Sequence, residues 1–303
     1  MTSRPSRRSR PSLTTANANA ALPDKTATTR NNPAAKQAGH PAGTAAKTSL
    51  PLFSLFLMAA FAQQPAAAQQ QSAQPAQAEG APSWGLGLGV GTERAPYRDF
   101  DNKTRLLPLL TYENKWISVL GLGADLKLPS AGPVSFRLRA RYSMDGYEAS
   151  DSPFLAGMEE RKDGIWLGGA AIWRNDIANL SAELLGDASG NSKGTKFKLM
   201  VDRRFQAGSF DITPRLAATR LDDKYVSYYY GVNAAEVRAG RPFYQGSSAV
   251  NLEAGLRMGY AIAPRQSVFL DLSTTRLGSS IKDSPLVDRS SQSSVRVGYL
   301  YRF

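Results

Sequence analysis

The most regular feature of this sequence is an alternation of apolar and polar residues along most of its second part. Residues 135–145 carry apolar side chains at even positions and Ser, Arg or Asp at odd positions, and residues 250–260 repeat the pattern. A period of two places successive side chains on opposite faces of a β-strand. Comparable segments occur at residues 84–92, 104–112, 116–128, 165–175, 178–187, 195–205, 210–220, 267–277 and 295–303. The pattern predicts an all-β protein.

The lengths of the strands and connections indicate a membrane barrel. Most segments reach the ~9–11 residues that a tilted strand needs to cross a bilayer, whereas strands of soluble domains are usually nearer ~5–6 residues. Short turns at 113–115, 175–176, 206–209 and 263–266 contrast with long connections at 146–163, 221–247 and 278–292. Because lipid leaves no partner for free backbone groups, spanning strands have to close on themselves. We therefore expect a closed antiparallel transmembrane β-barrel with short periplasmic turns and long extracellular loops.

The number of strands is open at this point. The pattern gives eleven segments from residue 84 onward, whereas single-chain bacterial barrels have an even number of strands. The ambiguous segment is 116–128, which either folds inward or splits into two short strands. We expect 10 or 12 strands.

The first 83 residues differ from the rest of the chain. Residues 1–48 contain almost no large apolar side chain, and a basic residue, Lys47, precedes the apolar run 50–62. That run is too short to span a bilayer as a helix, and the small-residue site 66–68 follows it, as in a secretory signal peptide. We expect cleavage after Ala68, with Ala62 as second choice. The long basic leader suggests that translation starts further downstream, with a long unstructured region before the apolar run as the alternative. The domains expected are a removed leader and signal peptide (1–68), a disordered linker (69–83) and the barrel (84–303).

Charge and composition exclude several functions. Removing residues 1–68 leaves 29 basic and 24 acidic residues, so the net charge falls from +12 to +5 and a nucleic-acid partner loses its main support. Cysteine is absent, and the sole histidine, His40, lies in the leader. The mature chain therefore lacks the side chains of histidine-based triads, cysteine nucleophiles and common zinc sites. We expect no enzymatic activity, no metal and no cofactor.

The polar faces of the strands carry many charges that would line the barrel. Two interpretations remain open, a network of ion pairs that fills a narrow barrel and an arginine-lined constriction that favours anions. The candidate interior charges are Arg137, Arg139, Arg141, Glu253, Arg257, Asp271 and Arg296, accompanied by Glu183, Asp202, Asp211, Arg215 and Arg302.

The carboxyl terminus ends on alternating aromatic residues, Tyr299, Tyr301 and Phe303. An aromatic terminal residue after an alternating strand is similar to the signal by which barrel-assembly machinery recognises its substrates. We therefore expect the assembly machinery and outer-membrane lipid as partners.

The long connection at 221–247 contains the most distinctive motif. Tyr228, Tyr229, Tyr230, Gly231, Val232, Glu236, Gly240 and Tyr244 resemble the YYGV-x-x-x-E-x-x-x-x-G-x-x-x-Y loop of the MipA/OmpV family of outer-membrane proteins. Residues 283–287 resemble a segment of the family's last long loop. We also interpret residues 233–239 as a short amphipathic helix, capped by Asn233 and ended by Gly240.

The resemblance implies a function that the residues themselves do not show. Some family members are described as scaffolds that link a lytic transglycosylase to a murein synthase, and others are linked to adhesion or to stress and drug response. The family has no catalytic residues to transfer. We expect an outer-membrane scaffold or interaction protein, with a small-solute, anion-favouring channel or an adhesin as the alternatives.

Overall fold

The computed structural model describes residues 82–303. The expected leader, signal peptide and cleavage sites, and nearly all of the expected linker, lie outside the described residues. None of the helices in the described part is long and apolar enough to cross a membrane.

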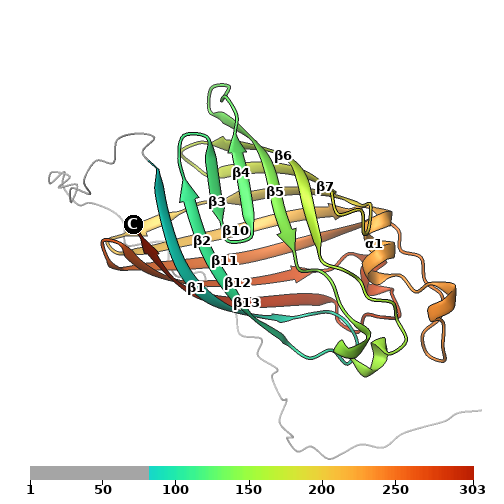
Figure 1. Cartoon of the computed structure of the whole chain (residues 1–303). Helices are drawn as coiled ribbons and strands as arrows, with labels where there is room; N and C mark the ends of the chain where they lie inside the picture. The colour runs from blue at the N-terminus through green and yellow to red at the C-terminus, as the bar shows by residue number, and fades with distance from the viewer. Residues whose placement is uncertain (1–81) are drawn as a thin grey trace, which may run out of the picture. The chain divides into compact units, whose positions relative to one another are not determined.

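The described chain forms one continuous antiparallel sheet that closes into a barrel (Figure 1). The last strand pairs with the first over ten residue pairs, from Gly85–Arg302 to Arg94–Ser293, and this pairing closes the sheet on itself. The strands are β1 (Ser83–Arg94), β2 (Lys103–Glu113), β3 (Ile117–Leu120), β4 (Gly123–Lys127), β5 (Val134–Ser143), β6 (Gly164–Arg174), β7 (Asn179–Asp187), β8 (Thr195–Asp202), β9 (Phe205–Ala207), β10 (Phe210–Leu221), β11 (Ala249–Ala263), β12 (Gln266–Arg276) and β13 (Ser291–Arg302).

Two observations settle the number of strands. Strands β8 and β9 both pair with β10 and are separated only by Arg203 and Arg204, so together they form one interrupted strand of the wall. The ambiguous segment 116–128 splits into the short hairpin β3–β4, which turns at Gly121 and Leu122. The wall of the described barrel therefore has twelve strands, and the predicted fold class is confirmed.

The two faces of each strand differ as the alternation predicts. The even positions over residues 84–90 of β1 and in β5 are apolar, and several, such as Leu86, Leu88 and Leu138, are exposed on the outer surface. The odd positions over the same parts of the strands are glycine, serine or arginine and are buried or only partly exposed. An apolar outside and a polar inside are the faces that a barrel needs in a bilayer.

The long extracellular connections fold together into an extracellular cap. Four of them contribute, 95–102, 144–163, 222–248 and 277–290, and they contain helix α1 (Asp223–Tyr230), helix α2 (Ser279–Lys282) and three 3₁₀ turns, at Ala149–Asp151, Pro153–Leu155 and Ala234–Glu236. Their buried side chains pack with the ends of the strands into one apolar core, which includes Tyr97, Tyr147, Trp166 and Tyr229. The main apolar core of the described chain thus lies at one end of the barrel.

The predicted helix over residues 233–239 is wrong. Only Ala234–Glu236 forms a 3₁₀ turn, after which Val237 is extended and Arg238 pairs with Arg241 around Gly240. The α-helix lies earlier in the loop, where the Asp222 side chain accepts a hydrogen bond from the Tyr225 N–H and caps α1. The helix stops at Gly231, whose position leaves no space for a Cβ atom against the Ser227 carbonyl.

Candidate functional site

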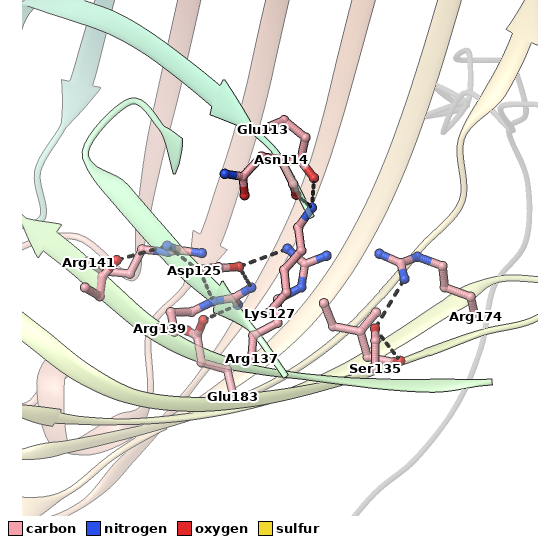
Figure 2. A network of polar contacts seen from close by, with 12 residues as sticks. Glu113, Asn114, Asp125, Lys127, Ser135, Arg137, Arg139, Arg141, Arg174 and Glu183 are labelled. Atoms are coloured by element: carbon pink, nitrogen blue, oxygen red, sulfur yellow. Dashed lines mark hydrogen bonds and ion pairs between the residues drawn. The ribbon is translucent and has the colours of Figure 1, made fainter. Parts of the chain in front are cut away.

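Asp125 is the centre of one charged cluster inside the barrel (Figure 2). It lies on β4 and is 6% exposed, and the three arginines of β5 surround it. Arg139 binds it with two hydrogen bonds of 2.9 and 2.7 Å, while Arg137 and Arg141 lie 3.2 and 3.0 Å from its oxygens. Arg139 also reaches Glu183 on β7 at 2.5 Å. The predicted arginine triplet thus joins three strands through two carboxylates.

A second charged cluster links strands on the opposite part of the wall. Arg215 on β10 donates to Glu253 on β11 at 2.8 Å and to Asp271 on β12 at 2.9 and 3.0 Å. Lys198 binds the second oxygen of Glu253 at 2.9 Å, and Arg296 lies 3.9 Å from Asp271. Most of the interior arginine charge is therefore compensated by carboxylates nearby.

The remaining candidate charges form no ion pair within 4.0 Å with the described residues of these clusters. Arg257 lies over the Phe269 ring, 4.0 Å from its centroid, and has no carboxylate within 4.0 Å in the described structure. Asp202 accepts a hydrogen bond from Asn179, and Asp211 lies 3.2 Å from Arg204. Arg302 lines an interior cavity near the periplasmic end.

The loop motif lies at the centre of the extracellular cap. Tyr229, Tyr230, Val232 and Glu236 are buried, and Val232 pairs with Tyr244 across the loop. Side-chain and backbone hydrogen bonds then tie the motif to three other loops, one of them through the Tyr97 hydroxyl, which donates to the Tyr229 carbonyl. Toward loop 144–163, Tyr228 accepts from Arg161 Nε and the Lys162 N–H, and Tyr229 donates to the Lys162 carbonyl. Toward loop 277–290, Tyr230 accepts from Ser284, and Tyr244 donates to the Ser280 carbonyl. Within the motif, Gly240 adopts a φ of +78°.

Glu236 forms a buried ion pair with Arg161. The Arg161 Nη2 atom lies 2.8 and 2.9 Å from the two carboxylate oxygens, and both side chains are almost completely buried. Burial acts to raise the pKa of Glu236, but backbone N–H groups of Asn233 and Glu159 and the Arg161 guanidinium hold it below its ordinary value. The motif glutamate is therefore a charged link between the loops 144–163 and 222–248.

The segment 283–287 also lies in the cap. The Ser284 hydroxyl donates to the Tyr230 carbonyl at 2.6 Å, and Leu286 and Val287 are buried. Both segments that resemble the family loops therefore meet in one packed core.

The carboxyl terminus closes against the first strand. The Phe303 ring stacks on Trp84 with centroids 3.9 Å apart, and its N–H donates to the Trp84 carbonyl. Tyr301 contacts Phe303 edge to face, whereas Tyr299 donates to Gln266. The recognition of these residues by assembly machinery stays a prediction.

Some structurally central residues escaped the sequence analysis. Asp125 and Arg161 were not singled out, because an isolated charge in a strand or loop gives no sign of the partners that other segments bring to it. Among the described residues, no group of three or more His, Asp or Glu side chains is placed to hold a metal ion.

The fold and the two faces of the wall define the class of protein, an outer-membrane β-barrel whose outer end is covered by its own loops. The sequence model of the family described as MltA-interacting protein MipA matches residues 85–303, and the chain belongs to this family. The MipA/OmpV resemblance is thereby confirmed, and so is the outer-membrane location.

Curated relatives extend this comparison. The chain is 28% identical over 235 residues to the MltA-interacting protein of Escherichia coli, which covers 77% of this chain and 94% of the relative. It is 24% identical to the putative outer membrane protein YiaT of Escherichia coli, over 72% of this chain and 90% of the relative. The outer membrane protein OmpV of Vibrio cholerae is 27% identical, over 52% of this chain and 61% of the relative.

Similar solved structures include other barrels. The NanC porin is 11% identical with a TM-score of 0.39, covering 71% of this chain and 98% of that one. OmpT of Vibrio cholerae is 7% identical with a TM-score of 0.34, covering 73% and 97%.

Proposed function

We propose that this protein is a non-enzymatic interaction protein of the outer membrane that holds a murein-remodelling enzyme at its periplasmic face. The observation that carries the proposal is the family match, together with the alignment over nearly the whole length of the relative named for its interaction with MltA. The partner class proposed is a lytic transglycosylase, with a murein synthase as the second member of the assembly.

The short periplasmic turns are the surface proposed for this contact. Ile177 lies at the tip of one turn and is 77% exposed, and Trp116 is exposed in another. The Asn175 side chain accepts hydrogen bonds from the Ile177 and Ala178 N–H groups, and Arg203 donates to the Ile177 carbonyl. A large apolar side chain held outward by a fixed turn suits a protein contact.

Site-specific photo-crosslinking in intact cells tests the proposal. A photoreactive residue at Ile177 is expected to cross-link to a periplasmic lytic transglycosylase. The matched control is the same residue at Phe243, which is 59% exposed but lies in the extracellular cap, and which should give no such product. Recovery of no murein enzyme from either Ile177 or Trp116 would contradict the proposed scaffold.

The absence of catalysis is a separate part of the proposal. It is supported by the missing histidine and cysteine in residues 69–303 and by the ion pairing of most interior acidic groups. Purified barrel incubated with murein sacculi is expected to release no soluble fragments. Release that persists in repeated purifications would show an enzymatic activity.

One observation favours a channel as the second candidate function. The barrel interior contains a cavity of about 660 Å³ that several arginines line. The extracellular end, however, is filled by the buried aromatic core of the cap, and several interior arginines, such as Arg139 and Arg215, are paired with carboxylates. A scaffold is therefore better supported than an open anion channel.

A further inference from the structure

The barrel wall is incomplete between β2 and β5. The hairpin β3–β4 fills this part of the wall (Figure 1). Strand β3 pairs only with Thr111–Glu113 of the eleven-residue strand β2. No strand in residues 82–303 pairs with Lys103–Leu110 on the side away from β1. The hairpin turns at Gly121 and Leu122. On the extracellular side of this turn no strand fills the space between β2 and β5, and we call this part of the wall the opening.

The unpaired edge of β2 contains a proline that disfavours pairing with a further strand. The Leu110 carbonyl accepts from the Gly121 N–H at 2.8 Å, so the backbone groups of even-numbered residues in β2 point toward the opening. Pro108 is at one of these positions and has no N–H to leave unpaired. Proline at an exposed edge also prevents regular pairing with an added strand.

The opening lies at the level of the membrane. Leu106, Leu110 and Leu122 border it and are exposed on the outer face. At its extracellular end, Lys103 and Asp151 form an ion pair of 2.6 Å between β2 and the loop 144–163. The opening is therefore bordered by apolar side chains that contact lipid and is limited at its outer end by a salt bridge.

Behind the opening is the interior cavity of about 660 Å³, within the range of ~300–1,000 Å³ typical of small-molecule sites. Its wall includes Pro108, Gly121 and Leu122 from the opening itself. One side is apolar, although most of the barrel interior is charged. Leu107, Leu109, Phe269 and Leu300 make this side, and they pack beside inward-facing glycines of β1 and β13.

The other side of the cavity is positively charged. Its charged lining residues are four arginines and two aspartates: Arg204, Arg257, Arg296, Arg302, Asp211 and Asp271. Arg257 has no carboxylate within 4.0 Å in the described structure and borders the apolar side through its contact with Phe269. A guanidinium that makes no ion pair within 4.0 Å and borders an apolar wall suits an anionic head group attached to a hydrocarbon chain, even though Asp271 lies opposite it in the β11–β12 pairing.

We propose that this cavity binds an amphiphile with an acyl chain and an anionic head group, which enters sideways from the membrane between β2 and β5. The chain lies against Leu107, Leu109 and Phe269, and the head group binds Arg257. The proposal is independent of the scaffold function, since it concerns the barrel interior and not the periplasmic turns.

A photoreactive fatty acid tests the position of the ligand. The barrel without residues 1–68 is placed in phosphatidylcholine nanodiscs together with a 16-carbon fatty acid that carries a diazirine near its methyl end. The sample is then irradiated to activate the diazirine. Labelling is expected on the inward-facing residues Leu107, Leu109 or Phe269. Labelling confined to outward-facing residues such as Leu167 and Leu184, or a covalent dimer through β2, would overturn the proposal.

Substitutions test the chemistry. Arg257→Gln is expected to weaken fatty-acid binding about tenfold or more, the size expected for a charge-assisted hydrogen bond, and to leave binding of the 16-carbon alcohol unchanged. Arg174→Gln is the matched control, since it removes the same charge from the periplasmic rim. Leu107→Gln combined with Leu109→Gln should weaken both probes.

The outcomes are read only on variants that migrate as folded barrels on unheated gels. If Arg257→Gln does not fold, Arg257→Lys replaces it and is expected to retain most of the preference for the acid over the alcohol. Equal affinities of wild type and the folded Gln variants for the acid would overturn the proposal, as would equal affinities of the wild type for acid and alcohol.

Discussion

Glu236 shows how a single residue of the loop motif organises the cap. Its two oxygens accept from Arg161, and each also accepts from a backbone N–H, one of Asn233 in its own loop and one of Glu159 in another. A buried carboxylate with all of these partners is stable in its charged form. Removal of the carboxylate leaves the Arg161 guanidinium buried without its main counter-charge.

Glu236→Gln is therefore expected to destabilise the cap by about 3–5 kcal/mol, the range for breaking one side of a buried ion pair. The measurement is protease cleavage of loop 222–248 under native conditions, with folding of the barrel checked by gel migration. Glu159→Gln is the control, because Glu159 also faces Arg161, at 3.9 Å, but is 76% exposed. Equal protease resistance of both variants would contradict this role of Glu236.

The same residue predicts a response of the cap to acid. The pKa of Glu236 lies below its ordinary value of 4.5, because its hydrogen bonds and Arg161 outweigh the effect of burial. Because this pKa is lowered, the stabilisation of the cap by the Glu236 carboxylate is fully present above about pH 4.5, and it is lost as the pH falls through the pKa of the folded state. Protease protection of the cap should be constant from neutral pH to about 5 and then decrease, and the decrease should be smaller in Glu236→Gln.

At the scale of elements, most strands were predictable, whereas the hairpin β3–β4 was only one of two alternatives for residues 116–128. Lipid and the charged interior impose opposite polarities on the two faces of each strand, so the alternation survives in the sequence. Residues 117–127 alternate with little interruption, and their turn at Gly121 and Leu122 has no polar turn residue. Helix α1 was missed for a different reason, because its tyrosines are weak helix formers that packing in the cap stabilises.

Asp125 connects this hairpin to the rest of the wall. Asp125→Asn leaves Arg137, Arg139 and Arg141 without their shared carboxylate, and we expect a loss of about 1.5–3 kcal/mol, the value of a hydrogen bond to a charged group. The folded band on gels should convert to the unfolded band at a lower temperature. Asp176→Asn, in an exposed periplasmic turn, should leave the transition unchanged. A transition of Asp125→Asn at the wild-type temperature would show that the cluster does not hold the hairpin.

At the scale of the whole molecule, the cap decides what the barrel can transmit. Sequence motifs predicted that two of the loops in the cap are distinctive. They did not predict that four loops meet in one core, because contacts between distant loops leave no periodic pattern in the sequence. The Tyr97 ring packs against the rings of Tyr147 and Tyr230, which come from two other loops, with centroid distances of 4.8 and 5.5 Å. This packing closes the extracellular end over the interior cavities.

The cap therefore predicts the electrical behaviour of the barrel. In planar bilayers the wild-type protein is expected to show no discrete conductance steps, because buried aromatic side chains fill its outer end. Replacement of residues 224–246 by a short Gly-Ser linker removes Tyr225, Tyr229 and Tyr230 together and should produce steps, since the interior below retains open volume. A matched variant that shortens only the periplasmic turn 175–178 should remain silent. Frequent wild-type steps of the same size as those of the loop deletion would mean that the cap does not close the barrel, and would favour the channel function over the scaffold.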